Sequence, residues 1–291
     1  MALYAFDGTW NKEHNAGEYG RNTNVVRFKD LYTGPKFFYV GVGTKHGFFG
    51  KLFGGAFGAG GHERIAAAKQ DLANQIAQGD DVVDIIGFSR GAALALHFTN
   101  VVEGGVTVTT AAGTRTVKPQ VRFLGLWDVV AAFGIAVDIG IRFSRINLGY
   151  KLELGKHVKY CFHALALDEH RQAFRPTRTP NGYEAWFRGV HSDVGGGNGN
   201  HGLNDITMRW MLRKAIAVGL PLPAGSDMAN TGAWNADGAI GTNFDVLEPI
   251  TRAVGKTDRM HYSVSTRPKC VGPLEGCPQE TTQLELLAEA M

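Results

Sequence analysis

The chain has 291 residues, of which 44% are hydrophobic and 20% are charged, and its formal net charge is +3. This length fits one large α/β domain or two modest ones, with enough apolar residues for a sizeable core. The small net charge, with lysine and arginine scattered along the chain, argues against a nucleic-acid-binding protein.

The three cysteines, Cys161, Cys270 and Cys277, are too few for a disulfide framework. We expect free thiols, with a Cys270–Cys277 bridge only in an oxidising compartment. The N-terminus has neither a basic segment nor a long apolar run, so no Sec-type signal is predicted. The apolar run closest to membrane-spanning length, 129–141, is short and contains Asp138. We therefore expect synthesis in the cytoplasm, and any export by a route that reads no such signal.

The first part of the chain predicts two strands, a loop and a helix. Residues 3–6 are apolar and end at Asp7-Gly8-Thr9, which is typical of a buried strand followed by a turn. Residues 36–42 predict a second strand. The glycine-rich stretch 47–61 contains several phenylalanines and fits either a packed Ω-like loop or a lid that contacts lipid. Apolar residues at helical spacing predict a helix over 63–77.

The middle of the chain continues the alternation of strands and helices. A β-branched run at 81–88 predicts a strand, and the alanine- and leucine-rich segment 90–102 predicts a helix. Residues 107–118 alternate threonine with valine and alanine, as in a small hairpin. Residues 121–127 predict another buried strand, which ends at Asp128.

The last elements complete the predicted domain. The segment 161–171 has a helical pattern, 184–190 predicts a final strand, and 204–218 predicts an amphipathic helix. Strands that alternate with helices predict a mostly parallel sheet with helices on both faces. We therefore expect one α/β domain over 1–222. A linker and a short C-terminal appendage over 223–291 should follow it and pack on the same domain.

Ser89 lies in the pattern Gly87-x-Ser89-x-Gly91, between a predicted strand and a predicted helix. A tight strand–turn–helix elbow needs small residues at both flanking positions, and it lifts the serine hydroxyl off the sheet. The helix N-terminus beside the hydroxyl favours negative charge. The alternative is a glycine-flanked serine that caps a core helix, but the strand and helix on either side favour a nucleophile.

A nucleophilic serine needs a base, and the base needs an orienting carboxylate. Asp128 follows the strand predicted at 121–127, and His191 follows the strand predicted at 184–190. With Ser89, all three residues fall just past a strand, at the edge where α/β sheets gather catalytic groups. They also occur in the chain order serine, acid, histidine of α/β-hydrolases.

Other residues compete for the same roles. His261 is the main rival of His191, and Asp193 is two residues away from that histidine. The other acidic rivals of Asp128 are Asp84, Asp138 and Asp168. We expect Asp193 to bond locally to the following glycine turn, and Asp168 to lie on a helix in an ion-pair face with Glu169 and Arg171.

Metal and nucleotide sites have no sequence support. There is no H-E-x-x-H pattern and no Cys/His ligand spacing. There is also no P-loop, and no G-x-G-x-x-G placed after a strand. We therefore predict neither a metal nor a cofactor.

Several strings together resemble a known family of otherwise uncharacterised hydrolases. This family is typified by the catalytic domain of type VI secretion phospholipase effectors of the first lipase class (Tle1-like). The resemblance covers most of residues 2–222. The matching strings are Phe6-Asp-Gly-Thr-Trp-Asn11, Thr23-Asn-Val25, Gly41-Val-Gly-Thr44, Gly87-Phe-Ser-Arg-Gly-Ala92, Leu126-Trp-Asp-Val129, Ala164-Leu-Ala-Leu-Asp-Glu169 and Gly189-Val-His-Ser-Asp-Val-Gly-Gly-Gly197.

The resemblance implies an α/β-hydrolase-like fold and a catalytic triad of Ser89, Asp128 and His191. It also implies cleavage of lipid acyl esters, typically as phospholipase A, by an antibacterial toxin delivered to the periplasm or membrane of a target cell. The partners it implies are a phospholipid or other acyl-ester substrate at a membrane surface, a secretion-apparatus component and an immunity protein.

The mechanism expected from these residues is attack by Ser89 on an ester carbonyl, with His191 as base and Asp128 holding the imidazole. We expect the oxyanion to accept hydrogen bonds from the backbone N–H of Arg90 and from an N–H of the Gly8–Thr9 turn. Two alternatives are a soluble carboxylesterase or thioesterase without a membrane substrate, and a catalytically silent binding module on the same scaffold.

Overall fold

A computed structural model describes residues 1–8, 13, 21–41, 56–131, 149–242, 250–266 and 279–280. Within these residues, eight strands form one sheet in the order β10-β9-β8-β7-β6-β3-β1-β2, and every neighbouring pair is parallel. The strands are β1 (Ala2–Phe6), β2 (Lys36–Tyr39), β3 (Val82–Phe88), β6 (Gln120–Trp127), β7 (Tyr160–Ala166), β8 (Tyr183–Phe187), β9 (Arg259–His261) and β10 (Gln279–Glu280).

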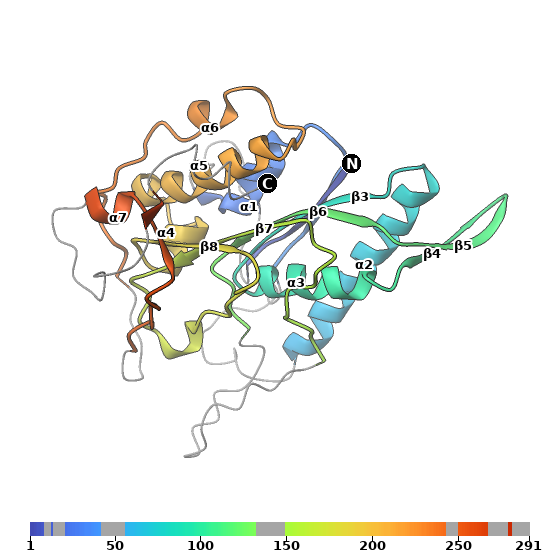
Figure 1. Ribbon diagram of the computed structural model, residues 1–291, viewed down its shortest axis with the longest axis horizontal. Coiled ribbons are helices and arrows are strands. Elements are labelled where there is room, and N and C mark those ends of the chain that lie inside the picture. Colours follow the sequence, from blue (N-terminus) through green and yellow to red (C-terminus); the bar gives the residue numbers. More distant parts are fainter. Residues whose placement is uncertain are drawn as a thin grey trace, which may run out of the picture.

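Helices cover both faces of this sheet, as predicted (Figure 1). Helices α2 and α3 lie on one face, and α1, α4 and α5 lie on the other. The helices are α1 (Asn24–Leu31), α2 (Ala56–Ala77), α3 (Arg90–Val102), α4 (His191–Gly195), α5 (His201–Ala217), α6 (Ser226–Ala229), α7 (Ser263–Thr266) and the 3₁₀ turn η3 (Gln172–Phe174).

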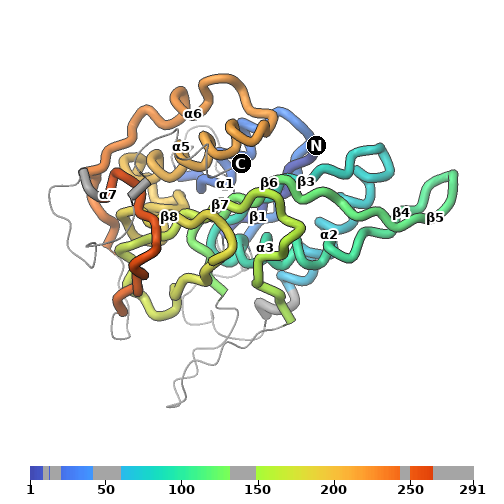
Figure 2. The backbone as a smooth tube through the Cα atoms, in the orientation of Figure 1, coloured from blue at the N-terminus to red at the C-terminus, as the bar shows by residue number. Residues whose placement is uncertain are grey.

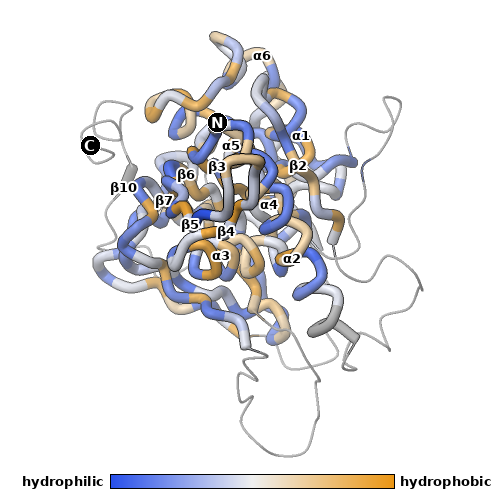
Figure 3. Tube along the Cα trace, turned by 90° about the vertical axis from the view of Figure 1, so that its right-hand side faces the viewer, coloured by the Kyte–Doolittle hydropathy of each residue, from blue (hydrophilic) through white to orange (hydrophobic). Residues whose placement is uncertain are grey.

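Each face of the sheet has its own hydrophobic core, because the side chains of a buried parallel strand alternate between the two layers. Tyr4 and Phe6 of β1 pack with Phe98 of α3 in one core. Leu3 and Ala5 of the same strand belong to the other core, with residues of α1 and α5. Hydrophobic stretches, orange in Figure 3, accordingly gather toward the middle of the molecule, for example at α3.

The direction in which successive strands are added to the sheet reverses between β1 and β3. From β1 the chain passes to β2 on one side, and the next strand, β3, lies on the other side of β1. Such a switch point leaves a crevice outside the carboxyl ends of the two strands, because the connections leave on opposite faces. The carboxyl end of β3 is therefore the place where a site is expected.

The hairpin predicted at 107–118 is confirmed. Strands β4 (Val106–Thr110) and β5 (Gly113–Val117) are antiparallel and form a separate two-stranded sheet. The pair projects from the main body (Figure 2). Thr109 and Thr114 face each other across it, with hydroxyl oxygens 3.0 Å apart.

The helix predicted at 161–171 is wrong, because residues 160–166 form strand β7 between β6 and β8. Residues 161–166 are all buried, so apolar side chains occur on both faces of the strand. A strand covered on both sides has no alternation to separate it from a short helix. Asp168 consequently follows a strand and does not lie on a helix.

Three other features of the elements also differ from the prediction. Strand β8 is not the final strand, because β9 and β10 of the C-terminal segment extend the sheet beyond it. Helix α2 begins at Ala56, inside the stretch predicted as a glycine-rich loop, and most of the rest of that stretch lies outside the described residues. Helix α1 was not predicted from the pattern. The predicted domain boundary at residue 222 stays a prediction.

Candidate active site

Ser89 occupies a strained turn between β3 and α3. Its backbone has φ 60° and ψ −127°, in the left-handed half of conformational space that a residue with a Cβ rarely adopts. The Ser89 N–H donates to the carbonyl of Trp127 at 3.0 Å, and the N–H of Val130 donates to the carbonyl of Ser89 at 3.2 Å. These bonds join the turn to the chain at the end of β6, where Asp128 begins the loop.

The two glycines of the elbow are required by close backbone contacts. A Cβ at Gly91 would lie 2.3 Å from the carbonyl oxygen of Phe6 and 2.4 Å from that of Asp7. A Cβ at Gly87 would lie 2.6 Å from the Cα of Ala92. Helix α3 therefore begins directly against the ends of β1 and β3. A tight elbow with small residues at Gly87 and Gly91 requires this close approach.

Asp128 is fully buried just past the end of β6 and also has a positive φ, 41°. Its carboxylate oxygens have different partners. Oδ1 accepts a hydrogen bond from the N–H of Ala166 at 3.0 Å, and Oδ2 lies 2.6 Å from Nδ1 of His191. The structure thus brings together two of the three residues that the strand ends predicted, although they are 63 positions apart.

His191 is the first residue of the short helix α4. Its ring packs between Phe88, at a centroid distance of 4.6 Å, and Phe174, at 4.8 Å. Its backbone N–H donates to Oε2 of Glu169 at 3.2 Å. Because Nδ1 faces Asp128, Nε2 is the ring nitrogen left for another group.

Ser89 and His191 are both almost completely buried, at 6% and 5% exposure. Phe88, the residue before Ser89, contacts the imidazole directly. Between these two described residues no hydrogen bond from the Ser89 hydroxyl to His191 is present. In enzymes without a bound substrate such bonds are often long, and they tighten in the substrate complex.

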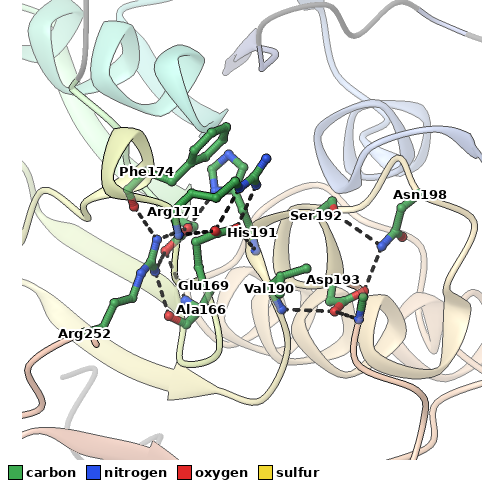
Figure 4. A network of polar contacts seen from close by, with 12 residues as sticks. Ala166, Glu169, Arg171, Phe174, Val190, His191, Ser192, Asp193, Asn198 and Arg252 are labelled. Atoms are coloured by element: carbon green, nitrogen blue, oxygen red, sulfur yellow. Dashed lines mark hydrogen bonds and ion pairs between the residues drawn. The ribbon is translucent and has the colours of Figure 1, made fainter. Parts of the chain in front are cut away.

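Arg252 is the site residue that sequence reasoning missed. It comes from the C-terminal segment and is 3% exposed. Its Nη1 donates to Oδ1 of Asp128 and its Nη2 to Oδ2, at 2.6 and 3.0 Å. The same groups donate to the carbonyls of Ala166 and Phe174, both at 2.6 Å (Figure 4). A single arginine in a weakly patterned segment has no local signal for such a role.

The buried charges set opposite proton affinities for the acid and the base. Burial alone would raise the pKa of Asp128, but the Arg252 guanidinium and the hydrogen bond to His191 hold it well below its ordinary value. Burial lowers the pKa of His191 below its ordinary value, and the hydrogen bond to Asp128 offsets this only in part. Asp128 is therefore an anion at neutral pH, and His191 is a neutral imidazole able to accept a proton.

The rival histidine, His261, lies on β9 in a different arrangement. It is buried, and its Nδ1 lies 2.8 Å from the Ser263 hydroxyl. Its ring stacks on Phe187. Burial lowers its pKa to about 3. Among the described residues it has no carboxylate partner, so it lacks the orienting group that His191 has.

The rival carboxylates have structural partners. Asp84 binds Arg122 and Tyr32, and Asp168 binds Arg188 and the N–H of Gly189. Asp193 accepts from the N–H groups of Val190 and Gly241, at 3.0 and 2.8 Å, so its bonds are local to the turn and to one later segment. Asp138 lies outside the described residues.

Of the expected oxyanion donors, the structure describes Arg90 and Gly8. Arg90 is the first residue of α3, so its backbone N–H belongs to the open N-terminus of that helix. The N–H of Gly8 donates to Oδ1 of Asp7 at 2.7 Å. Thr9 lies outside the described residues. In this structure Gly8 is thus bonded to a carboxylate, and an oxyanion would have to compete for its N–H.

Asp7 connects two segments that carry the family resemblance, residues 6–11 and residues 23–25. Its Oδ1 also accepts from the Thr23 hydroxyl at 2.9 Å, and Oδ2 is buried without a hydrogen-bond partner among the described residues. Burial raises the pKa of Asp7 to about 7. The side chain of Asn24, next to Thr23, donates to the carbonyl of Val194, so both strings converge on the edge of the sheet that carries Ser89 and His191.

The described residues hold neither a metal-binding cluster nor a membrane-spanning helix. They contain no group of three or more His, Cys, Asp or Glu side chains arranged to hold a metal ion. They also contain no helix long and apolar enough to cross a membrane.

Comparison with protein families gives one match over most of the chain. A family model described as "T6SS, Phospholipase effector Tle1-like, catalytic domain" matches residues 3–107 and 103–214. These residues include the elbow, the end of β6 and the start of α4.

A solved structure shares the fold of this chain. An uncharacterized protein from Pseudomonas aeruginosa has a TM-score of 0.52 at 21% identity, over 80% of this chain and 48% of that one. The Tle1 effector, in a complex with the VgrG spike from the type 6 secretion system, has a TM-score of 0.47 at 24% identity, over 67% of this chain and 50% of that one. This chain spans about half the length of the solved proteins that it matches.

A curated protein matches more locally. The uncharacterized protein YEL023C of Saccharomyces cerevisiae is 42% identical over 57 residues, which are 18% of this chain and 8% of that protein.

Proposed function

This chain belongs to the family of Tle1-like phospholipase effector catalytic domains of type VI secretion systems, and we propose that it cleaves acyl esters of phospholipids as a serine hydrolase of the phospholipase A type. The observation that carries the proposal is the buried 2.6 Å contact between His191 and Asp128, beside the strained elbow of Ser89.

The arrangement supports a two-step acyl transfer. Ser89 Oγ attacks the ester carbonyl carbon while its proton passes to Nε2 of His191. Asp128 holds Nδ1–H and stabilises the imidazolium that forms. The C–O bond to the glycerol oxygen then breaks, and the same proton passes to that oxygen as the lysophospholipid leaves. A water deprotonated by His191 hydrolyses the acyl-serine and releases the fatty acid.

Charge on the carbonyl oxygen needs donors in both tetrahedral states. The N-terminus of α3 supplies the backbone N–H of Arg90 beside Ser89. The Gly8–Thr9 turn expected from the sequence is the proposed second source, and Gly8 lies just past the end of β1, the strand next to β3. The loss of one such donor raises the barrier by about 3 kcal/mol.

Delivery and partners belong to the same proposal. Family membership supports transport by a type VI apparatus to a target cell, action on lipid there and neutralisation by an immunity protein. In the solved complex, it is the Tle1 effector that is bound to the VgrG spike. For this chain we propose a secretion-apparatus partner without specifying which component binds.

The nucleophile is tested with a fluorophosphonate probe and with fatty-acid release from phospholipid vesicles. We expect Ser89→Ala to lose both labelling and release, while Ser226→Ala, a buried serine in α6, keeps them. Full hydrolysis by Ser89→Ala would refute the assignment.

The substrate class is tested separately. Release from vesicles with little release from soluble short-chain esters or thioesters supports the phospholipase. The reverse preference would make the protein a soluble esterase or thioesterase, and an absence of labelling and turnover in the wild type would make it a silent binding module.

A further inference from the structure

We propose that Arg252 is a positioning residue for this hydrolase: its guanidinium fixes the carboxylate of Asp128 for His191 and thereby makes catalysis depend on the seating of the 250–266 segment. This inference rests on the function proposed above. Neither the family match, which ends at residue 214, nor the strand-end argument includes Arg252.

The geometry fixes both oxygens of the acid. Arg252 Nη1 donates to Oδ1 and Nη2 to Oδ2, in the bidentate arrangement that suits a planar guanidinium. The N–H of Ala166 also donates to Oδ1. Rotation of the carboxylate about χ2 would break these bonds, so Oδ2 is held where Nδ1 of His191 meets it.

The guanidinium is itself fixed by the main chain. Its two Nη groups donate to the carbonyls of Ala166, at the end of β7, and Phe174, in η3. Phe174 is also the ring that packs against His191 (Figure 4). Arg252 therefore joins two elements, one that contacts Asp128 and one that contacts His191, and its side chain is completely buried.

Arg252 and Asp128 carry opposite charges and are equally buried. Both Arg252 and Asp128 side chains have no exposure, and a buried charge that loses its partner is strongly destabilised. Among the described residues, the carboxylate of Asp128 would otherwise have only the neutral His191 and one backbone N–H as partners. Arg252 thus keeps the acid ionised in a place that water does not reach.

The charged groups that face His191 define what Arg252 changes. Asp128 and Glu169 favour its protonated form, and Arg252 opposes it. Arg171 is bonded to both oxygens of Glu169 and lies over Phe174, so Glu169 is already neutralised by an ion pair. The remaining close neighbours of the ring, Phe88 and Phe174, are apolar. As long as Asp128 stays ionised, removal of the Arg252 charge therefore raises the proton affinity of His191.

The test compares Arg252→Gln and Arg252→Lys with the wild type, by kcat, KM and the pH profile of vesicle hydrolysis. Displacement of catalytic groups by an ångström costs about 100-fold in rate. We expect kcat of Arg252→Gln to fall ten- to a hundred-fold (about 1 Å of lost positioning) with KM little changed. We also expect the acid limb of its profile to move to higher pH. Arg252→Lys keeps the charge but not the bidentate contact, so its kcat falls less and its acid limb stays near the wild type.

The chain offers a matched control. Arg122, at the other end of β6, makes a bidentate contact with the fully buried Asp84. Arg122→Gln removes an equivalent ion pair away from Asp128, so it should lower stability without moving the acid limb. If Arg252→Gln is folded and shows a wild-type kcat and acid limb, the inference is overturned.

Two further outcomes have a defined meaning for the proposal. If Arg252→Gln does not fold, Arg252→Lys decides alone, because wild-type kcat in that variant would contradict the bidentate role. Probe labelling of the wild type at Ser89 is measured first. Without that labelling the proposed hydrolase fails for its own reasons, whereas labelled wild type with an unaffected Arg252→Gln refutes only the role of Arg252.

Discussion

Ser89 and Asp128 are the two non-glycine residues with positive φ in the part of the chain that the structure describes. Backbone strain of this kind costs about 1–3 kcal/mol per residue and persists where surrounding contacts enforce it. Here those contacts are the hydrogen bonds that join the elbow to the end of β6. Strain at two of the three proposed catalytic residues is consistent with a site that is fixed before substrate binds.

Strain at Ser89 predicts a stability difference between two inactive variants. Ser89→Gly relieves the positive φ, whereas Ser89→Ala keeps a Cβ there. We expect Ser89→Gly to be more stable than Ser89→Ala by about 1 kcal/mol, after the entropy cost of glycine. Denaturant unfolding of the two variants measures this, and equal stabilities would mean that the turn is unstrained.

The lowered pKa of His191 predicts the acid limit of activity. A general base acts in its neutral form, and burial keeps His191 neutral below its ordinary pKa of 6.5. We therefore expect kcat/KM to reach half its maximum below pH 6.5 and to stay level through neutral pH. A half-maximum above this value would show that Asp128 outweighs burial.

Asp7 predicts a pH dependence of stability. Its pKa rises from 3.8 to about 7 on folding, so its contribution is fully present below about pH 3.8 and is lost as the pH rises through about 7. Asp7→Asn removes this dependence while an amide oxygen can still accept from Gly8 and Thr23. We expect a higher Tm than wild type above pH 7, by the equivalent of about 2–4 kcal/mol. A Tm difference that is constant from pH 4 to 8 would contradict the titration.

At the scale of elements, the contact of α3 with β1 fixes the elbow. A methyl group at Gly91 would meet the carbonyl oxygens of Phe6 and Asp7, neither of which can move without disturbing β1. We expect Gly91→Ala to lower the free energy of unfolding by about 1–3 kcal/mol and to abolish probe labelling. Gly104→Ala is the control, because nothing lies within 4 Å of its added Cβ. Labelling of Gly91→Ala at the wild-type rate would show that the elbow tolerates a shift.

Strand ends were the most informative elements of the sequence. A β-branched run predicted β3 and a buried apolar run predicted β6, and the polar residues after these runs are Ser89 and Asp128. Strand β7 was not predictable in this way, because burial on both faces removes the alternation that marks a strand. Strand β9 has only three residues, too few for any periodic pattern.

Arg252 was not predictable for a different reason. Its partners, Asp128, Ala166 and Phe174, are between 78 and 124 positions away, so no local spacing encodes the contact. The pairing of β9 with β8, which is distant in the sequence, brings the C-terminal segment to this edge of the sheet.

At the scale of the whole molecule, the C-terminal segment is attached to β8 by more than β9. Asp258 accepts a bidentate contact from Arg178 and a hydrogen bond from Nε1 of Trp186, a residue of β8. Burial alone would raise the pKa of Asp258, but Arg178 holds it below its ordinary value. These contacts lie six positions after Arg252 and restrain the same segment.

This attachment predicts coupling between Asp258 and Arg252. We expect Asp258→Ala to lower both stability and kcat, because a loosened segment holds Arg252 less firmly. The effects of Asp258→Ala and Arg252→Gln on kcat should overlap in the double variant and not multiply. Multiplying effects, measured in a double-mutant cycle, would show that the segment is seated without Asp258.

The place of Arg252 in the chain has a consequence for biosynthesis. Ser89, Asp128 and His191 leave the ribosome first, and Arg252 follows His191 by about sixty residues, which take several seconds to add at ~5–20 residues/s. During that interval the nascent chain has the proposed nucleophile, acid and base, but Asp128 lacks its buried counter-charge. A hydrolase assembled in this order gains its full activity only when the late segment is made and folds back onto β8.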